Sequence, residues 1–255
     1  MGLMAGAVCG LAGVFVVLWR MSLVGICISH AAFAGALVAL WLGFPPLGGG
    51  LLASLAAASV VGPMSERPNL SLDTAIGVVF AIMLSLAMLA LGLLPGAKTE
   101  GLSLLWGSLL AASRLDLLLM GALALGLITY ISLFFKEIQA IIGQRRAALA
   151  AGIPVRPIYY GCLILIGLTV AVSLKAVGGM LIYALIITPA STAMQITYSL
   201  RGMFFLSAGL GAAAAVIGLW LSFHLGLPSG AAIVLTSAVG LVAAMLLSPK
   251  KAYPK

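Results

Sequence analysis

The stretch that decides the fold is residues 22–43, SLVGICISHAAFAGALVALWLG, which carries one imidazole and no Lys, Arg, Asp or Glu. A helix of about 20 apolar residues can span the hydrocarbon of a bilayer, because it satisfies its backbone hydrogen bonds internally. Comparable runs recur through the 255-residue chain, of which 64% is hydrophobic and 7% charged. The mean hydropathy is +1.28. The sequence therefore predicts an all-α fold, a polytopic bundle of transmembrane helices.

The apolar runs predict nine membrane spans, or eight if the short first run does not cross the bilayer completely. No segment between them is long and polar enough for a soluble domain, so residues 1–255 are expected to form a single transmembrane domain. The first run has no basic residue before Arg20, unlike the positively charged start of a cleavable signal peptide. The expected spans are residues 3–19, 22–43, 47–63, 74–94, 116–135, 158–173, 177–196, 203–224 and 229–247.

Lysine and arginine predict the orientation of these spans. If the spans alternate, ten of the 13 basic residues fall on one side, and the positive-inside rule makes that side cytoplasmic and the N-terminus external. The net charge of +8 then reflects topology and does not indicate nucleic-acid binding. The ten are Arg20, Arg67, Lys136, Arg145, Arg146, Arg156, Arg201, Lys250, Lys251 and Lys255; the other three are Lys98, Arg114 and Lys175.

Two connections between spans predict structure of their own. Residues 95–115, on the outside, contain an apolar stretch too short to span, which favours an interfacial or re-entrant helix. Residues 136–157 form the longest cytoplasmic segment. In it Leu149 and Ile153 share a helical face, and Gly152 followed by Pro154 supplies a stop. We expect a short helix there that packs against a protein partner.

Small residues are frequent within the spans, as in GGGLLASLAAAS at 48–59 and GAAAA at 211–215. Such residues allow helix backbones to approach closely in lipid, where no hydrophobic effect drives helices together. Ordinary packing within the chain and a tight seam between two copies are both compatible with them. The three cysteines all lie in apolar runs and indicate no disulfide framework.

The sequence lacks the usual signatures of catalysis and of ion-coupled transport. All five acidic residues lie in loops or at the ends of spans, so no carboxylate is placed at mid-membrane to carry protons or sodium. There is no GxxxxGK[ST] phosphate-binding loop. We therefore expect a protein that is not an enzyme and does not hydrolyse ATP itself.

Histidine supplies the candidate metal ligands. His30 lies inside the second span, where an ionisable group is costly and is a functional hypothesis by default. Cys27 precedes it by three residues, so both side chains project from one face, and thiolate with imidazole suits Zn²⁺, Cu⁺ or Fe²⁺. The plainer alternative is a histidine bonded to a nearby carbonyl beside an inert cysteine. His224, at the outer end of the eighth span, is a weaker candidate.

The seventh expected span contains a proline flanked by hydroxyls. Pro189 removes a helix hydrogen bond, and Thr188 and Ser191 carry hydroxyls that can satisfy freed carbonyls. Broken spans often line translocation paths. These three residues are therefore predicted to line a path.

Five segments follow one another along nearly the whole chain: RMSLVGICISHAAFAG at 20–35, LDTAIGVVFA at 72–81, LLWGSLLAASRLDL at 104–117, KAVGGMLIYALIITPASTA at 175–193 and LGLPSGAAIVL at 225–235. In this order they resemble the ABC-3 family of bacterial permeases for zinc, manganese and iron. The similarity rests on all five together, since each alone is short.

The resemblance implies a multi-pass protein of the bacterial inner membrane, in which two copies form the translocation path. A separate ABC ATPase dimer is expected on the cytoplasmic face, with an extracytoplasmic metal-binding protein delivering the ion. IIGQRRAALAAGI at 141–153 is similar to the coupling helix of such importers. Its expected ATPase contacts are Gln144, Arg145, Ala147, Ala148, Leu149 and Gly152.

One departure from the family bears on the cargo. The family has an aspartate where this chain has Ile26, and of the family's Asp and His in the second span only His30 is present. The expectation is a transported transition-metal ion and no permanently bound cofactor, with zinc first and manganese or iron as alternatives. A divergent permease for a metal chelate or another small solute is the second reading, and a non-transporting membrane scaffold the third.

Overall fold

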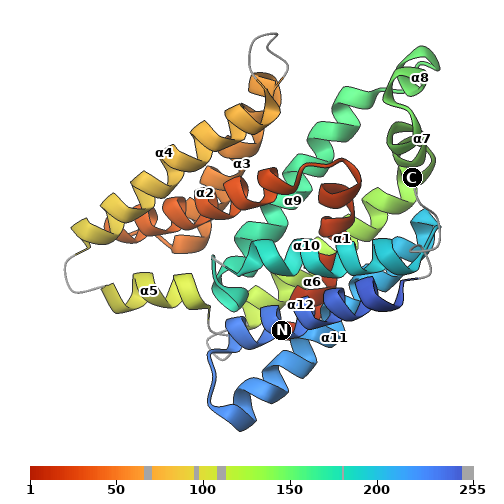
Figure 1. Ribbon diagram of the computed structural model, residues 1–255. Helices are drawn as coiled ribbons and strands as arrows, with labels where there is room; N and C mark the ends of the chain where they lie inside the picture. The colour runs from red at the N-terminus through yellow and green to blue at the C-terminus, as the bar shows by residue number, and fades with distance from the viewer. Residues whose placement is uncertain (66–70, 95–97, 108–112, 180, 249–255) are drawn as a thin grey trace.

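Helices make up all the regular structure of the part of the chain that the computed structural model describes, residues 1–65, 71–94, 98–107, 113–179 and 181–248 (Figure 1). The prediction of an all-α bundle is confirmed. The described helices are α1 (Gly2–Leu18), α2 (Ser22–Trp41), α3 (Pro46–Ser65), α4 (Leu72–Leu93), α5 (Lys98–Trp106), α6 (Arg114–Leu133), α7 (Phe135–Gly143), α8 (Arg145–Ala150), α9 (Val155–Val177), α10 (Ile182–Ile196), α11 (Leu200–Leu225) and α12 (Ser229–Leu247).

Six of these helices are long and apolar enough to cross a membrane, namely α2, α4, α6, α9, α11 and α12. The shorter apolar helices α1, α3 and α10 complete a set that matches the nine expected spans. One boundary was wrong. Spans were expected at 158–173 and 177–196, whereas α9 continues to Val177 and α10 begins only at Ile182.

Helix α1 lies at the centre of the bundle because its glycines let other backbones come close. It packs against α6, α9, α10 and α11. A side chain at Gly10 would collide with the carbonyl of Ser207 on α11, and one at Gly13 with the carbonyl of Ile186 on α10. The Ser207 hydroxyl also donates to the Gly10 carbonyl over 2.6 Å. Close contact of this kind drives helix association in lipid.

The two stretches of small residues both pack within the chain. A Cβ atom on Gly49 of α3 would meet the carbonyl of Gly35 on α2, and one on Gly211 of α11 would meet the carbonyl of Gly6 on α1. At these positions the first of the two expectations, ordinary packing inside one chain, is what the structure shows.

The break between α9 and α10 is stabilised by the external segment. Gly178 ends α9 with φ of 95°, a conformation that favours glycine. The Gly179 amide then donates to the Leu104 carbonyl of α5 over 3.0 Å. Gly179 also lies against Phe33 near the middle of α2, so α10 starts well inside the bundle. The expected short helix between spans is thus present as α5; residues 95–97 and 108–112 lie outside the described part.

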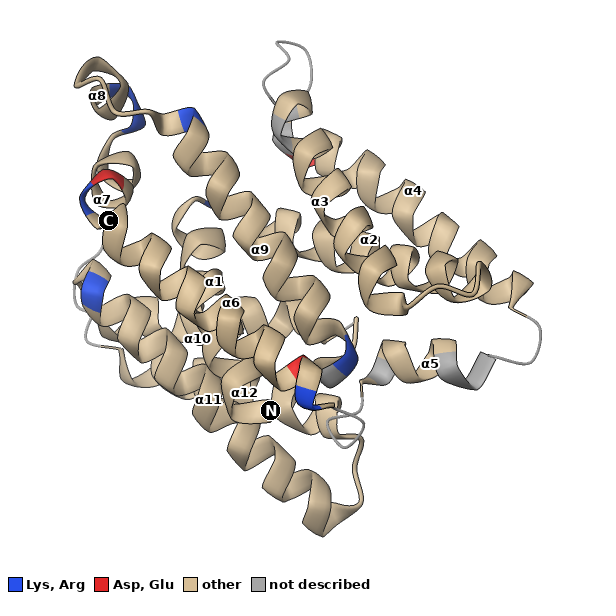
Figure 2. Cartoon of the chain, turned by 180° about the vertical axis from the view of Figure 1, so that it is seen from behind, with Lys and Arg blue, Asp and Glu red and all other residues tan. Residues whose placement is uncertain are grey.

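Charged residues divide between the two ends of the bundle. The basic residues of α7 and α8 and of the first turns of α9 and α11 gather at one end, and Arg114 and Lys175 lie at the other (Figure 2). Lys175 Nζ is 2.9 Å from Asp116 Oδ2, which joins the outer ends of α9 and α6. The predicted orientation rests on this division; Arg67 and the three C-terminal lysines lie outside the described residues.

Candidate functional site

One ring nitrogen of His30 keeps a lone pair that can bind a metal ion. Its side chain is half-buried, and Nδ1 lies 2.9 Å from the carbonyl oxygen of Ile26. A carbonyl only accepts, so in the neutral ring Nδ1 carries the proton and Nε2 keeps its lone pair. The ring meets Phe80 of α4 edge-on at 4.8 Å, which fixes its orientation. A backbone-held imidazole of this kind is how proteins prepare a metal ligand.

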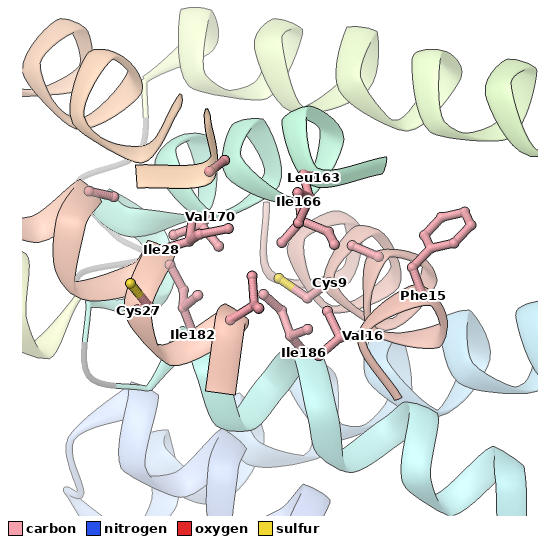
Figure 3. Packing of buried hydrophobic residues seen from close by; sticks show 14 of the residues in the cluster. Cys9, Phe15, Val16, Cys27, Ile28, Leu163, Ile166, Val170, Ile182 and Ile186 are labelled. Carbon is pink, nitrogen blue, oxygen red and sulfur yellow. The ribbon is translucent and has the colours of Figure 1, made fainter. Parts of the chain in front are cut away.

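Cys27 lies in a different environment from His30, although the two are three residues apart. Its side chain is fully buried in the hydrophobic cluster, close to Ile28 and to Ile182 of α10 (Figure 3). The i,i+3 spacing places both residues on α2, but it does not show which of them reaches open space. In this conformation only His30 is partly accessible.

Ile26 follows a glycine that lies against the start of α10. The ring of Tyr183 covers the neighbouring Gly25, with Cδ2 3.3 Å from where a Cβ would lie. Ile26 itself is half-buried and offers no metal ligand. Among the described residues no three His, Cys, Asp or Glu side chains come together as a metal site. The described part of one chain therefore provides one accessible imidazole at this place and no complete set of metal ligands.

The predicted path residues of α10 bond largely to neighbouring helix atoms. Thr188 donates to the Ala184 carbonyl over 2.7 Å, and its hydroxyl lies 2.5 Å from that of Ser237 on α12. Pro189 is buried and leaves the Leu185 carbonyl without its usual helix donor. Thr188 and Thr192 donate to the carbonyls of Ala184 and Thr188, so neither of these hydroxyls satisfies the carbonyl of Leu185. Ser191 is half-buried.

His224 stands apart from His30. It is exposed in the last turn of α11, with its ring against Trp220 and Phe223 at 4.5 and 5.6 Å. Helix α11 packs on α1, α10 and α12, while His30 packs on α4. The structure therefore does not bring the two histidines of one chain together.

The segment at 136–157, which was expected to be cytoplasmic, folds into α7 and α8, where one short helix was predicted. Gly152 has φ of 78° and ends it, as the sequence indicated. Among the six residues named for ATPase contact, Ala148 faces inward with 3% exposure, whereas Leu149 is 54% exposed. The other four are exposed as well. The outer surface is therefore built around Leu149, and Ala148 anchors the helix to the rest of the chain.

Aromatic contacts that sequence reasoning missed connect this segment to the base of α2. The Arg145 guanidinium lies 5.8 Å from the ring centroid of Tyr159, which stacks on Trp19 at 5.5 Å. The Tyr159 hydroxyl is 3.1 Å from the sulfur of Met21, in the turn before α2. Aromatic residues beside cytoplasmic basic residues were the available signal, but they are common at any membrane interface.

The family is decided by comparison with known sequences. Residues 1–248 match the model of the ABC 3 transport family. The chain belongs to this family. It is 33% identical over 250 residues to the manganese import system permease protein ScaB of Streptococcus gordonii, with 98% of this chain and 90% of ScaB covered. It is 31% identical to the chelated iron transport system membrane protein YfeD of Yersinia pestis, over 96% and 82% of the two.

Solved structures agree with the family assignment. The fold matches a chain of PsaBC from Streptococcus pneumoniae, solved with a Fab, with a TM-score of 0.88 and 31% identity over 99% of this chain and 91% of that one. A metal-chelate type ABC transporter in an inward-facing conformation shares the fold at a TM-score of 0.77 and 17% identity, over 96% and 83% of the chains. This member of the family is a multi-pass protein of the bacterial inner membrane.

Tyr159→Leu should loosen the connection between α8 and the turn before α2. The change removes the stacked ring and the contact with Met21, a loss of about 0.5–1.5 kcal/mol. We expect amides near Met21 and Val24 to exchange up to about tenfold faster in hydrogen-exchange mass spectrometry. Tyr198→Leu, at a tyrosine that is 74% exposed, is the control. Equal exchange in both variants would mean that the stack holds nothing in place.

Proposed function

We propose that this chain is the membrane permease of an ABC importer for a transition-metal ion. Membership of the ABC 3 transport family supports the transporter class, and relatives named for manganese and chelated iron support a metal cargo. The observation that carries the proposal is His30, whose Nε2 is left available on a half-buried face of a membrane helix. The ion is the cargo of this protein and not a resident cofactor.

Zinc is the ion that the residues of α2 favour. Imidazole suits zinc and iron, while manganese prefers carboxylate and carbonyl oxygens. The position at which the family resemblance implies a carboxylate is Ile26, and the described acids lie at helix ends. The manganese names of several relatives support the alternative. The chemistry of this chain nevertheless points to an ion softer than Mn²⁺.

A metal chelate is the second candidate cargo. The apolar side chain of Ile26, which offers no ligand atom, suits an organic ligand shell better than a bare cation, and YfeD is named for chelated iron. A chelated metal brings its own ligands and needs fewer from the path. The number of protein ligands required therefore separates this candidate from the first.

The partners follow from the same proposal. A second copy of the chain completes the path, a separate ABC ATPase dimer docks on residues 144–152, and a metal-binding protein delivers the ion from outside. The exposed Leu149, Arg145 and Gln144 support the docking surface. Absence of a phosphate-binding loop in the sequence leaves ATP hydrolysis to the partner.

His30→Ala should reduce metal uptake by about tenfold or more, since changes even in groups that only support a ligand cost 10–100-fold. Uptake of radioactive zinc by proteoliposomes that hold the whole transporter measures this. His224→Ala is the matched control, because that ring is exposed at the outer surface. Wild-type uptake by His30→Ala, in protein that is correctly assembled, would make His30 a packing residue.

Ile26→Asp should shift ion preference toward manganese. The change adds a hard oxygen ligand one helical turn from His30, and the measurement is competition between Mn²⁺ and Zn²⁺ for uptake. We expect the Mn²⁺ share to rise severalfold. Ile28→Asp would bury a charge in the core, so Leu23→Asp, at a 44% exposed position of the same helix, is the better control. An unchanged ratio of Mn²⁺ to Zn²⁺ uptake would mean that position 26 does not line the path, and it would favour a metal chelate as the cargo.

Leu149→Glu should uncouple ATP hydrolysis from uptake. A charge replaces the apolar residue at the centre of the exposed surface of α8, so the ATPase is expected to co-purify poorly while the permease stays folded. Gln139→Glu, at an exposed position on α7, adds the same charge outside the surface. Ala148→Glu is a poor test, because Ala148 is buried and the variant disturbs the fold. Full ATPase retention by Leu149→Glu would place docking elsewhere.

A further inference from the structure

A groove of about 880 Å³ opens between α6 and α11, on the surface of the bundle. Its floor is Leu11 of α1, and its walls are apolar residues of the two helices, with α7 closing one end. The volume lies within the ~300–1,000 Å³ typical of small-molecule sites. The family-based function assigns it no role, and none of the candidate metal or path residues lines it.

The groove is apolar along its length and cationic at one end. Lys136, at the start of α7, and Arg201, at the start of α11, line the end nearest the basic surface of the bundle (Figure 2). From Arg201 the wall runs along α11 to Ala208, about 10 Å at the rise of an α-helix. The hydrocarbon core is about 30 Å thick, so the wall could cover about two-thirds of one leaflet. The shape and polarity fit an amphiphile, with its head at the charged end.

The charged end is arranged to receive an anion. The Arg201 guanidinium lies 5.1 Å from the ring centroid of Phe135, which holds it over the opening. Its planar N–H groups match the oxygens of a phosphate. Glu137 also lines the opening, so two cations face one acid and the local balance is +1. Basic pockets between membrane helices on the cytoplasmic side are known to bind acidic lipid head groups.

We propose that this groove binds an anionic phospholipid of the cytoplasmic leaflet. Its phosphate contacts Arg201 and Lys136, and one acyl chain lies between α6 and α11 over Leu11. Charge complementarity selects this occupant over a zwitterionic lipid, whose head has no net charge. The site is independent of the transported ion and of its path, so its test needs no transport assay.

The experiment is native mass spectrometry of the full chain, delipidated in detergent and titrated with phosphatidylglycerol or phosphatidylcholine of identical acyl chains. Wild type should bind the anionic lipid about tenfold more tightly, because both lipids offer a phosphate but Arg201 and Lys136 repel the choline cation of the second. Arg201→Gln should abolish that preference. Arg146→Gln removes an equal charge from the exposed surface of α8, outside the groove, and should leave it unchanged.

A second pair of variants tests the apolar end. Ala208→Phe fills the wall of the groove and should lower binding of both lipids, whereas Ala213→Phe, exposed elsewhere on α11, should not. Thermal unfolding of each variant checks that it is folded. Equal affinity for the two lipids, or a preference that survives Arg201→Gln, overturns the proposal. Cross-linking of two copies through Phe205→Cys, at an 80% exposed position of the groove, would show that a second chain covers it instead.

Discussion

The structure depends on the close contact of α1 with the backbones around it. Lipid tails are as apolar as leucine, so burial alone cannot hold membrane helices together, and direct packing must do so. Gly6 and Gly10 bring α11 against α1, Gly13 brings α10 against it, and the Cys9 thiol lies 3.6 Å from the Ser173 hydroxyl of α9. Any side chain at these glycines would meet a carbonyl group. The central helices are thus held closely together.

The packing of helix α2 changes along its length. Near its outer end Gly35 touches the backbone of α3 at Gly49. About one and a half turns earlier, His30 is only half-buried and rests on a single ring of α4. At its base, Arg20 has φ of 55°, and Met21 meets Tyr159 and through it the α8 segment. The candidate ligand therefore lies between a tightly held outer half and a base in contact with the cytoplasmic surface.

Sequence alone predicted the helices, their approximate number, and one short helix within each of the segments 95–115 and 136–157, because length, hydropathy and glycine stops are local signals. It did not predict that Ala148 faces inward, that Cys27 is enclosed or that α10 begins only at Ile182. In a soluble helix the buried side is apolar and the exposed side polar, so orientation can be read from the pattern. In a membrane helix both sides are apolar, and only contacts with other helices show which residue is enclosed. The break after Gly178 likewise depends on a bond to α5, more than 70 residues earlier.

A path for an ion must release what it binds, whereas four protein ligands hold zinc as a structural ion. Among the described residues one imidazole is accessible at the candidate position, and no cluster of three ligands surrounds it. In a two-fold pair of chains each donor occurs twice, because the axis repeats every residue of the interface. On the proposed two-copy path, the two copies of His30 would then supply two ligands, one from each chain. These two ligands can separate again when the chains move. A site of this kind exists only while both halves are together, which couples ion binding to the conformation of the pair.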